Sequence, residues 1–327
     1  MNFWNSLRKA GKPLFVMAPM ANVTDVVFRG LFAKYGKPDV TWTEFVSADG
    51  LISPGRKKLM IDLKFSPKER PIVAQLFTGH PEAMKKAAAL AAKLRFDGID
   101  INMGCPDRAV EKQGGGAAHI KNPKLAIEVL EAARAGAKGL PVSVKTRIGY
   151  NSYDIGWTRL LLEQKLPALT VHLRTRKEMS DVPAHWEHMG EIVRLRDEIS
   201  PETIILGNGD VESIEDGRAK IRKYGCDGVM IGRGIFGKPW LFEKKALHDF
   251  GESARERTPE ERLKILVEHA KLFEKTFKGV KSFAVMRKHF KAYVNGWDGA
   301  KELRAELMTA EDAKGVATIV KAYLKSC

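Results

Sequence analysis

The strongest constraint on the fold is a series of eight short apolar runs spread along the first three quarters of the chain. They are LFVMAPM at 14, VTWTEF at 40, PIVAQLF at 71, GIDINMG at 98, PVSVKTR at 141, ALTVHLR at 168, TIILGNG at 203 and GVMIGRG at 228. Short runs of this kind are typical of buried strands. An amphipathic segment separates most of them; PEAMKKAAALAAKLR, for example, starts at Pro81, a residue suited to the first turn of a helix.

Eight strand–helix units are the number found in a (β/α)₈ barrel. An open doubly wound sheet also alternates strands and helices, but the count and the polar residues at the strand ends favour the barrel. No strand-like run returns after about residue 245, and TPEERLKILVEHAKLFEKTF starts with a typical helix N-terminus at Thr258. We expect an α/β fold with a TIM barrel over residues 1–245 and an all-helical C-terminal domain over residues 246–327.

The composition bounds the class of protein. The chain has 327 residues, 44% hydrophobic and 29% charged, which is typical of a soluble globular protein. No apolar run approaches the ~18 residues of a membrane span and none resembles a signal peptide, so we expect a cytoplasmic protein. The three cysteines, Cys105, Cys226 and Cys327, lack metal-ligand spacing, so no metal is expected. The net charge of +15 favours either a polyanionic partner or a surface that serves solubility.

Polar residues gather where the predicted strands end. Active sites of TIM barrels lie at the C-terminal ends of the strands, so these side chains are candidates for one joint site. The candidates are Met20, Asn22, Glu44, Gln75, Asn102, Cys105, Lys145, Arg147, His172, Arg174, Asn208, Asp210 and Arg233. A structural role could explain any one of them, but their joint placement predicts a site.

The last two strands are followed by glycine-containing loops, LGNGDVESIEDG and MIGRGIFGKPW. Glycines let backbone amides approach a phosphate, and Arg233 could add a charge-assisted contact. This position in a barrel is where phosphate is often held. Lys145 would point into the same mouth, where a lysine can form a Schiff base, hold an anion, or simply extend into solvent.

Cys105 follows an apolar strand that Pro106 prevents from continuing. Its thiol could be an inert core group, a nucleophile or a proton donor; an unperturbed thiol is mostly protonated at neutral pH. A nucleophile would need a base, for which His119 and His172 are the candidates. The nearby QGGGAA segment, 113–118, does not match the dinucleotide fingerprint, and we expect a mobile loop over the barrel mouth rather than a Rossmann site.

Six motifs in order along the chain resemble the tRNA-dihydrouridine synthases, flavoenzymes that reduce uridine in transfer RNA. The motifs are MAPMANVTD, NMGCPDRAVEKQGGGAAH, VKTRIG, VHLRTR, GNGDV and MIGRGIFGKPWLF. The match runs through almost all of residues 14–245. The stretch MRKHFKAYVNGWDGAKELR, 286–304, resembles the family's helical domain more loosely.

The resemblance implies a barrel that binds FMN and is reduced by NADPH or NADH. Hydride would pass from flavin N5 to C6 of the uracil, and Cys105 would be the general acid that protonates C5. Asn102 matches the family's asparagine near the substrate uracil; otherwise its role would be to cap the turn at the strand end.

The resemblance also assigns the flavin site. Backbone contacts from Pro19 and Met20 would support the flavin ring and Gln75 would hydrogen-bond it. Lys145 would lie at the N1 and C2 carbonyl edge, where a cation stabilises the anionic reduced flavin. The remaining matches are His172 at the flavin, Asn208, Gly209, Gly232 and Arg233 at the ribityl and phosphate groups, and Asp210, which would order its loop.

The sequence VHLRTR departs from the family's HGRT form, because Leu173 stands in place of glycine. Arg174 and Arg176 are therefore expected either to bind substrate RNA phosphate or to pair with acids such as Asp181. RNA binding has separate support in a run of cations without an intervening acid: Lys275, Lys278, Lys281, Arg287, Lys288 and Lys291. The interleaved aromatic residues have the helical spacing of a core and are expected there: Phe277, Phe283, Phe290 and Tyr293.

The leading hypothesis is therefore an FMN-dependent monomer that reduces uridine in tRNA, with the target base extruded from its stack. One alternative is an FMN barrel that acts on a free pyrimidine or an enoate. Another is a phosphate-binding aldolase-like barrel that uses Lys145 without flavin. A further alternative is an RNA-binding protein without catalysis.

Overall fold

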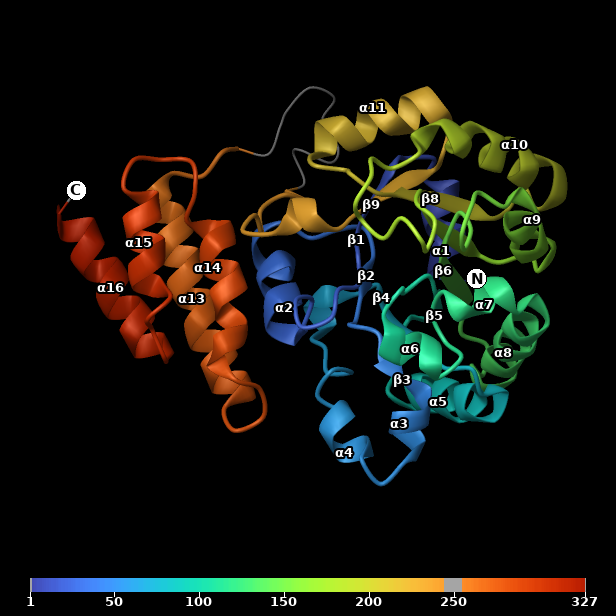
Figure 1. The fold of residues 1–327 in the computed structure, drawn as a ribbon, viewed down its shortest axis with the longest axis horizontal. Coiled ribbons are helices and arrows are strands. Elements are labelled where there is room, and N and C mark those ends of the chain that lie inside the picture. The colour runs from blue at the N-terminus through green and yellow to red at the C-terminus, as the bar shows by residue number, and fades with distance from the viewer. Residues whose placement is uncertain (1, 244–254, 327) are drawn as a thin grey trace.

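Eight parallel strands form a nearly closed barrel in the computed structural model, which describes residues 2–243 and 255–326 (Figure 1). The strand order is β1-β9-β8-β7-β6-β5-β4-β2, and the short β3 pairs with the end of β4. The bounds are β1 Leu14–Met17, β2 Thr41–Trp42, β3 Val46–Ser47, β4 Ile72–Phe77, β5 Gly98–Met103, β6 Val142–Arg147, β7 Ala168–His172, β8 Ile204–Asn208 and β9 Gly228–Ile231. Each of the eight predicted strands is confirmed, and β3 is an addition.

Closure of the barrel distinguishes it from an open sheet. The amide of Asp39, just before β2, donates to the carbonyl of Phe15 in β1 at 3.0 Å. The Asp39 carboxylate in turn accepts from the Phe15 amide at 2.8 Å. These bonds join the first and last strands of the order, so the predicted TIM barrel is confirmed.

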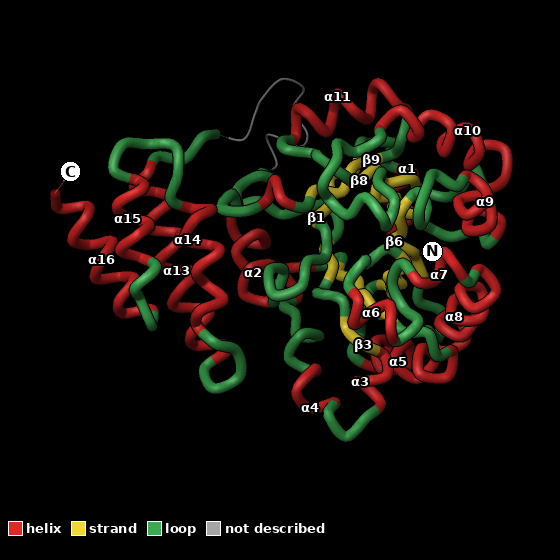
Figure 2. Tube along the Cα trace, in the orientation of Figure 1, coloured by secondary structure: helices red, strands yellow, loops and turns green. Residues whose placement is uncertain are grey.

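Helices surround the strands, as Figure 2 shows in red around yellow. The helix predicted from residue 81 is α5, and it buries one alanine-rich face, including Ala83, Ala87 and Ala91. The N-terminal helix α1 places the buried Trp4 among inward-facing strand residues such as Val16 and Met230. The helices of the barrel region are α1 Phe3–Lys9, α2 Val26–Tyr35, α3 Ala48–Ile52, α4 Arg56–Leu59, α5 Pro81–Lys93, α6 Arg108–Lys112, α7 Ala118–Lys121, α8 Pro123–Gly136, α9 Ile155–Glu163, α10 Met189–Ile199 and α11 Ile214–Tyr224.

Within the part of the chain that the structure describes, four helices follow the barrel at the left of Figure 1, and α13 packs against α2. They are α13 Pro259–Phe277, α14 Arg287–Tyr293, α15 Ala300–Leu307 and α16 Ala313–Ser326. Thr258 and Glu261 form a capping box at the start of α13, as the Thr-Pro-Glu-Glu pattern predicts. The helical C-terminal region is thus confirmed, while the predicted boundary at residues 245/246 lies outside the described residues.

The four helices have a core of their own, which also includes Val27 of α2 and Trp240. The aromatic residues interleaved with the cations belong to it: Phe277, Phe290 and Tyr293 are buried and Phe283 packs against them. Their predicted core role is confirmed. Within the two described ranges, no helix is both long enough and apolar enough to cross a membrane.

Candidate active site

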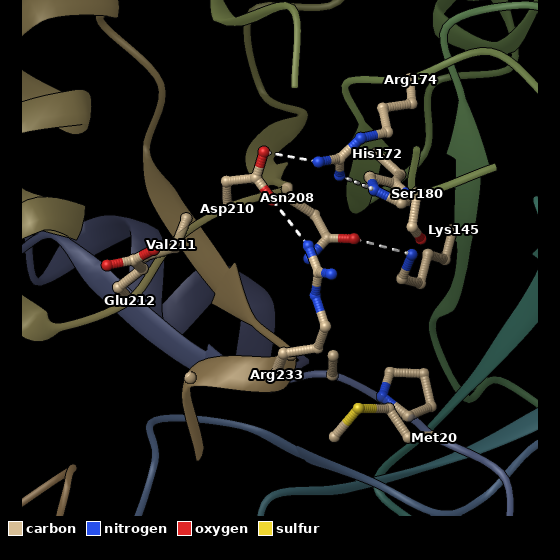
Figure 3. Close-up of a pocket in the computed structure, with 15 residues that line it drawn as sticks. Met20, Lys145, His172, Arg174, Ser180, Asn208, Asp210, Val211, Glu212 and Arg233 are labelled. Carbon is tan, nitrogen blue, oxygen red and sulfur yellow. Dashed lines mark hydrogen bonds and ion pairs between the residues drawn. The ribbon is translucent and has the colours of Figure 1, made fainter. Parts of the chain in front are cut away.

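A cavity of about 460 Å³ lies at the C-terminal ends of the strands (Figure 3). The barrel explains why residues so distant in sequence meet there. His172, the last residue of β7, lies in register with Asn208, the last residue of β8. Of the ten predicted cofactor residues, nine line this cavity: Pro19, Met20, Lys145, His172, Asn208, Gly209, Asp210, Gly232 and Arg233. Arg174, predicted as a substrate residue, lines it as well.

Lys145 lies half-buried in the cavity wall, on β6. Its Nζ donates to Asn208 Oδ1 at 3.1 Å, and Asn208 Nδ2 donates to the carbonyl of Met230 at 2.8 Å. Burial, reinforced by the charge of Arg147, lowers the pKa of the Lys145 ammonium to about 8. The interpretation as a solvated strand-end lysine is therefore wrong, and the amine is poised close to its titration point at the wall of the cavity.

A second polar chain lies in the cavity wall at the end of the neighbouring strand β7. His172 Nε2 accepts from Arg174 Nη1 at 3.1 Å. Burial, together with the surrounding cations, lowers the pKa of His172 well below its usual value, so the ring is neutral. Because Nε2 is the acceptor, the proton resides on Nδ1, which is available as a donor.

Asp210 joins the two arginines of this wall. Its carboxylate pairs with Arg174 and with Arg233, the latter at 2.8 Å, and also accepts from the amide of Ala184. These partners lower the pKa of Asp210 against the opposing effect of burial. The geometry fits the loop-ordering role expected for Asp210, and it holds the otherwise exposed Arg233 guanidinium at the cavity.

Two glycines shape the backbone of the cavity. Gly209 has φ +121°, and a Cβ there would lie 2.7 Å from Cβ of Ala184, so only glycine fits. At Gly232, a Cβ would meet no atom nearer than 3.8 Å, so the backbone faces open space. An anion can therefore approach the backbone at Gly232 beside Arg233.

Asn102 and Cys105 form the turn that ends β5. Asn102 Oδ1 accepts from the amides of Gly104 and Cys105 at 3.1 and 2.9 Å. Burial raises the pKa of the half-buried Cys105 thiol, and the charge of Asp107 acts in the same direction. The thiol is therefore protonated at neutral pH, which suits a proton donor better than a nucleophile.

The two candidate bases are both engaged elsewhere. The ring of His119 donates from Nε2 to the carbonyl of Thr78 at 3.0 Å, and burial lowers its pKa to about 4. His172 is held by Arg174. Neither arrangement supplies a base to the Cys105 thiol, so the geometry weighs against the nucleophile interpretation.

The glycine-rich segment after Cys105 differs from the mobile loop expected. Gly115, Gly116 and Ala117 are buried, and the Ala117 amide donates to the carbonyl of Cys105 at 2.9 Å. Gly116 has φ +59°, and a Cβ there would clash with that same carbonyl. The glycines thus allow close packing against the Cys105 turn.

Gln75 and Arg176 lie apart from the cavity lining. Gln75 is fully buried and donates from Nε2 to Asp100 at 2.7 Å. Arg176 donates from Nε to Glu111 at 2.9 Å. Of the two alternatives for the arginines, pairing with acids is what the structure contains, but the acids are Asp210 and Glu111 and not Asp181.

The sequence alone did not single out Asp100, and it placed Arg147 among the strand-end candidates without a specific role. Arg147 connects two strand-end loops by donating to the carbonyl of Gly104 at 2.8 Å and to that of Thr175 at 2.9 Å. Asp100 is completely buried in β5, beneath the Cys105 turn. A signal was present in both cases, because a charged residue inside an apolar strand needs a partner.

One of the six cations proposed for RNA binding has a different role. Lys281 Nζ lies 3.1 Å from Glu44 Oε2 and 2.9 Å from Asp62 Oδ1. The other Glu44 oxygen accepts from the amide of Asn22, two residues after Met20 of the cavity. Lys281 therefore anchors the helical region to the barrel. The exposed cations of the set are Lys275, Lys278, Arg287 and Lys291, while Lys288 is half-buried.

Among the described residues, His185, Glu187 and His188 have ligand-type atoms within 4.8 Å of one another. Both ring nitrogens of His185 already contact carboxylates, those of Glu178 at 3.0 Å and Glu187 at 2.9 Å. These contacts explain the raised pKa of His185. The absence of a metal stays a prediction.

Comparisons with known proteins place the chain. The sequence model of the dihydrouridine synthase (Dus) family matches residues 16–327. A probable tRNA-dihydrouridine synthase of Staphylococcus aureus (strain COL) is 44% identical over 314 residues, covering 95% of this chain and 92% of that protein. Probable tRNA-dihydrouridine synthase 2 of Bacillus subtilis (strain 168) is 41% identical over 323 residues, covering 98% and 95%.

Among solved structures, a variant of morphinone reductase in complex with tetrahydroNAD superposes with a TM-score of 0.51. The match covers 76% of this chain and 90% of the morphinone reductase chain, at 13% sequence identity. At this identity the likeness concerns the fold alone. The family model and the relatives extend over the barrel, the cavity and the C-terminal helices together. The chain belongs to the dihydrouridine synthase family.

Proposed function

We propose that the protein is a tRNA-dihydrouridine synthase that uses FMN and NADPH or NADH to reduce the C5–C6 double bond of uridines in tRNA. Membership of the family and the names of its relatives support this proposal. The observation that carries it is the pairing of a cationic cavity with the protonated thiol of Cys105 on the neighbouring strand end.

The chemistry of the cavity fits FMN. Lys145, Arg174 and Arg233 bring three cations to its lining, which suits a phosphate and an electron-rich ring. Arg233 and the open backbone at Gly232 would hold the phosphate, and Asn208 would hold the ribityl chain. Lys145 would contact the flavin, and Pro19 and Met20 would support its ring. When bound, the flavin supplies the hydride that C6 of the uracil receives, after its own reduction by NADPH or NADH.

The residues of the chain supply the proton and the orientation. Cys105 holds a proton on Sγ at neutral pH and donates it to C5 of the uracil. Asn102 fixes the turn that carries Cys105, and one hydrogen of its Nδ2 is left to contact the uracil. Proton donation by a positioned group contributes about 10²–10⁴-fold to a rate.

The substrate contacts would come from the basic surface of the C-terminal helices. Four exposed cations, Lys275, Lys278, Arg287 and Lys291, are suited to RNA phosphates. The target nucleotide must leave its stack to reach the cavity. Arg174 and Arg176 are paired with acids in this structure. They would therefore affect RNA binding indirectly, by positioning the loop that contains them. We further propose that the protein acts as a cytoplasmic monomer.

The test begins with the absorption spectrum of the purified protein under anaerobic conditions. NADPH should bleach the flavin bands, and unmodified tRNA should restore them with formation of dihydrouridine. Recovery of the bands with free pyrimidines or enoates but not with tRNA would favour a small-molecule reductase. A protein that binds no flavin even when FMN is supplied would refute the proposal.

A further inference from the structure

A buried relay of hydrogen bonds runs beneath the Cys105 turn, across strands β4 and β5. Asp100 Oδ2 accepts from Gln75 Nε2 at 2.7 Å. Gln75 Oε1 accepts from Asn102 Nδ2 at 3.3 Å. Asn102 Oδ1 then accepts from the amide of Cys105 at 2.9 Å. Asp100 and Gln75 have no exposed surface, and Asn102 is 6% exposed.

The carboxylate of Asp100 sets the direction of this relay. An ionised carboxylate only accepts hydrogen bonds, so the atom of Gln75 that faces it must be the amide nitrogen. The oxygen of Gln75 then faces Asn102 and requires the nitrogen of Asn102 in return. The oxygen of Asn102 is thereby directed to the backbone amides of the Cys105 turn. If the Gln75 amide were reversed, its oxygen would face the acceptor oxygen of Asp100 and its nitrogen would face the donor nitrogen of Asn102. Both contacts are unfavourable, and in a buried site water cannot replace the lost hydrogen bonds.

The surroundings of Asp100 keep it suited to this role. Ser143 Oγ donates to its other oxygen at 2.6 Å. Burial raises the pKa of Asp100 to about 6, while the bonds from Ser143 and Gln75 and the charge of Lys145 oppose the rise. The carboxylate is therefore ionised at neutral pH despite its complete burial.

We propose that Asp100 is a positioning residue for the proton donor: through Gln75 and Asn102 it holds the turn that presents Cys105. The inference rests on the proposed function for its kinetic consequence. Its structural part, that Asp100 controls the Cys105 turn, concerns this chain alone.

The test compares a substitution in the middle of β5, at Asp100, with one just before its first residue, at Asp97. Asp100→Leu removes the acceptor, whereas Asp100→Asn can still accept from Gln75 while its nitrogen donates to Ser143 Oγ. Asp97→Leu is the matched control: Asp97, at the opposite end of the barrel, accepts from the amide of Ile72 at 2.8 Å and pairs with Arg70. It loses a carboxylate between the same strands without touching the relay.

For Asp100→Leu we expect kcat for uridine reduction to fall about 10- to 100-fold, the range found when a partner that orients a metal-binding side chain is lost. The KM for tRNA should stay within about twofold, since the change acts on the proton donor. The assays use saturating FMN, because loss of the Asp100 charge also lowers the pKa of Lys145 in the cavity. Asp100→Asn should keep kcat within about threefold of the wild type, and Asp97→Leu should leave kcat per folded enzyme unchanged. Equal losses of kcat in Asp100→Leu and Asp97→Leu would indicate a merely structural role and overturn the inference.

A second readout needs neither flavin nor substrate. The rate of alkylation of Cys105 by iodoacetamide in the flavin-free chain, followed by peptide mass mapping, should rise at least about fivefold in Asp100→Leu because a released turn exposes the thiol. Should Asp100→Leu fail to fold, Gln75→Leu breaks the next link and should raise the alkylation rate similarly. A wild-type alkylation rate in the folded variant would overturn the relay. Failure of the wild type to form dihydrouridine would instead refute the proposed function, and the alkylation result would still decide the relay.

Discussion

The anchor between the helical region and the barrel gives a prediction with a definite size. The side chain of Lys281 is 14% exposed, that of Glu44 is 7% exposed and that of Asp62 is 22% exposed. Removing one partner of a buried pair costs about 3–5 kcal/mol, while an exposed pair contributes about 0–1 kcal/mol. The anchor lies between these limits, so Lys281→Met should lower the free energy of unfolding by about 2 kcal/mol.

A double-mutant cycle in urea denaturation isolates this interaction. Glu44→Gln keeps an oxygen for the Asn22 amide but removes the charge opposite Lys281. In the double variant, the free energy of unfolding should fall by less than the sum of the two single-variant losses, and the difference should be about 1 kcal/mol or more. The reason is that each single variant leaves one charge of the Lys281–Glu44 contact without its partner, whereas the double variant removes both charges. The control is Lys278→Met, an exposed lysine of the same loop, which should change the free energy of unfolding by no more than about 0.5 kcal/mol.

The same variants separate anchoring from RNA binding. Lys278→Met should weaken tRNA binding. It should also reduce the slope of log K against log salt concentration by about one, the value expected for the loss of one phosphate contact. Lys281→Met should leave the salt slope unchanged, because the ammonium of Lys281 is occupied by carboxylates. Two results would refute the reasoning. One is that the losses in the cycle add to within about 0.5 kcal/mol. The other is that Lys281→Met and Lys278→Met lower the free energy of unfolding equally.

Three further predictions concern the cavity. Cys105→Ala should slow uracil reduction by about 10²–10⁴-fold while flavin and tRNA binding are kept; unchanged turnover in stopped-flow reoxidation by tRNA would exclude the general acid. Arg233→Ala should lower the fraction of protein that retains FMN after gel filtration, and normal occupancy would count against the phosphate site. Because the pKa of Lys145 is lowered to about 8, its ammonium is present below that pH and lost above it. FMN affinity of the flavin-free protein, measured by fluorescence quenching, should therefore fall as pH rises through about 8, and Lys145→Gln should abolish this pH dependence.

Much of the fold follows from local patterns in the chain. Strands such as Gly98–Met103 and Val142–Arg147 were predictable because an apolar run of strand length is buried on both faces in a barrel. Once eight parallel strands are placed, their C-terminal ends must meet, so the order of the strands along the chain is enough to assign Lys145, His172 and Asn208 to one site.

The partners within the site were not predictable in the same way. Arg174 lies closer in sequence to Asp181 than to Asp210, yet it pairs with Asp210, 36 residues away. Lys281 belongs to a run of cations that is uniform in sequence, yet it pairs with Asp62 and with Glu44, the latter 237 residues away. The sequence contains the charges but not the distances between them, and Coulomb energy depends on those distances.

The sequence by itself therefore determined the barrel, the helical region that follows it, and the set of residues at the strand ends, because these depend on residue type and on order along the chain. Only the tertiary structure decided which side chains are ionised and which are held by others. The neutral ring of His172, the lowered pKa of Lys145 and the relay from Asp100 to Cys105 all arise from burial and from contacts between strands. Burial and contact exist only after the strands have been brought together in the closed barrel.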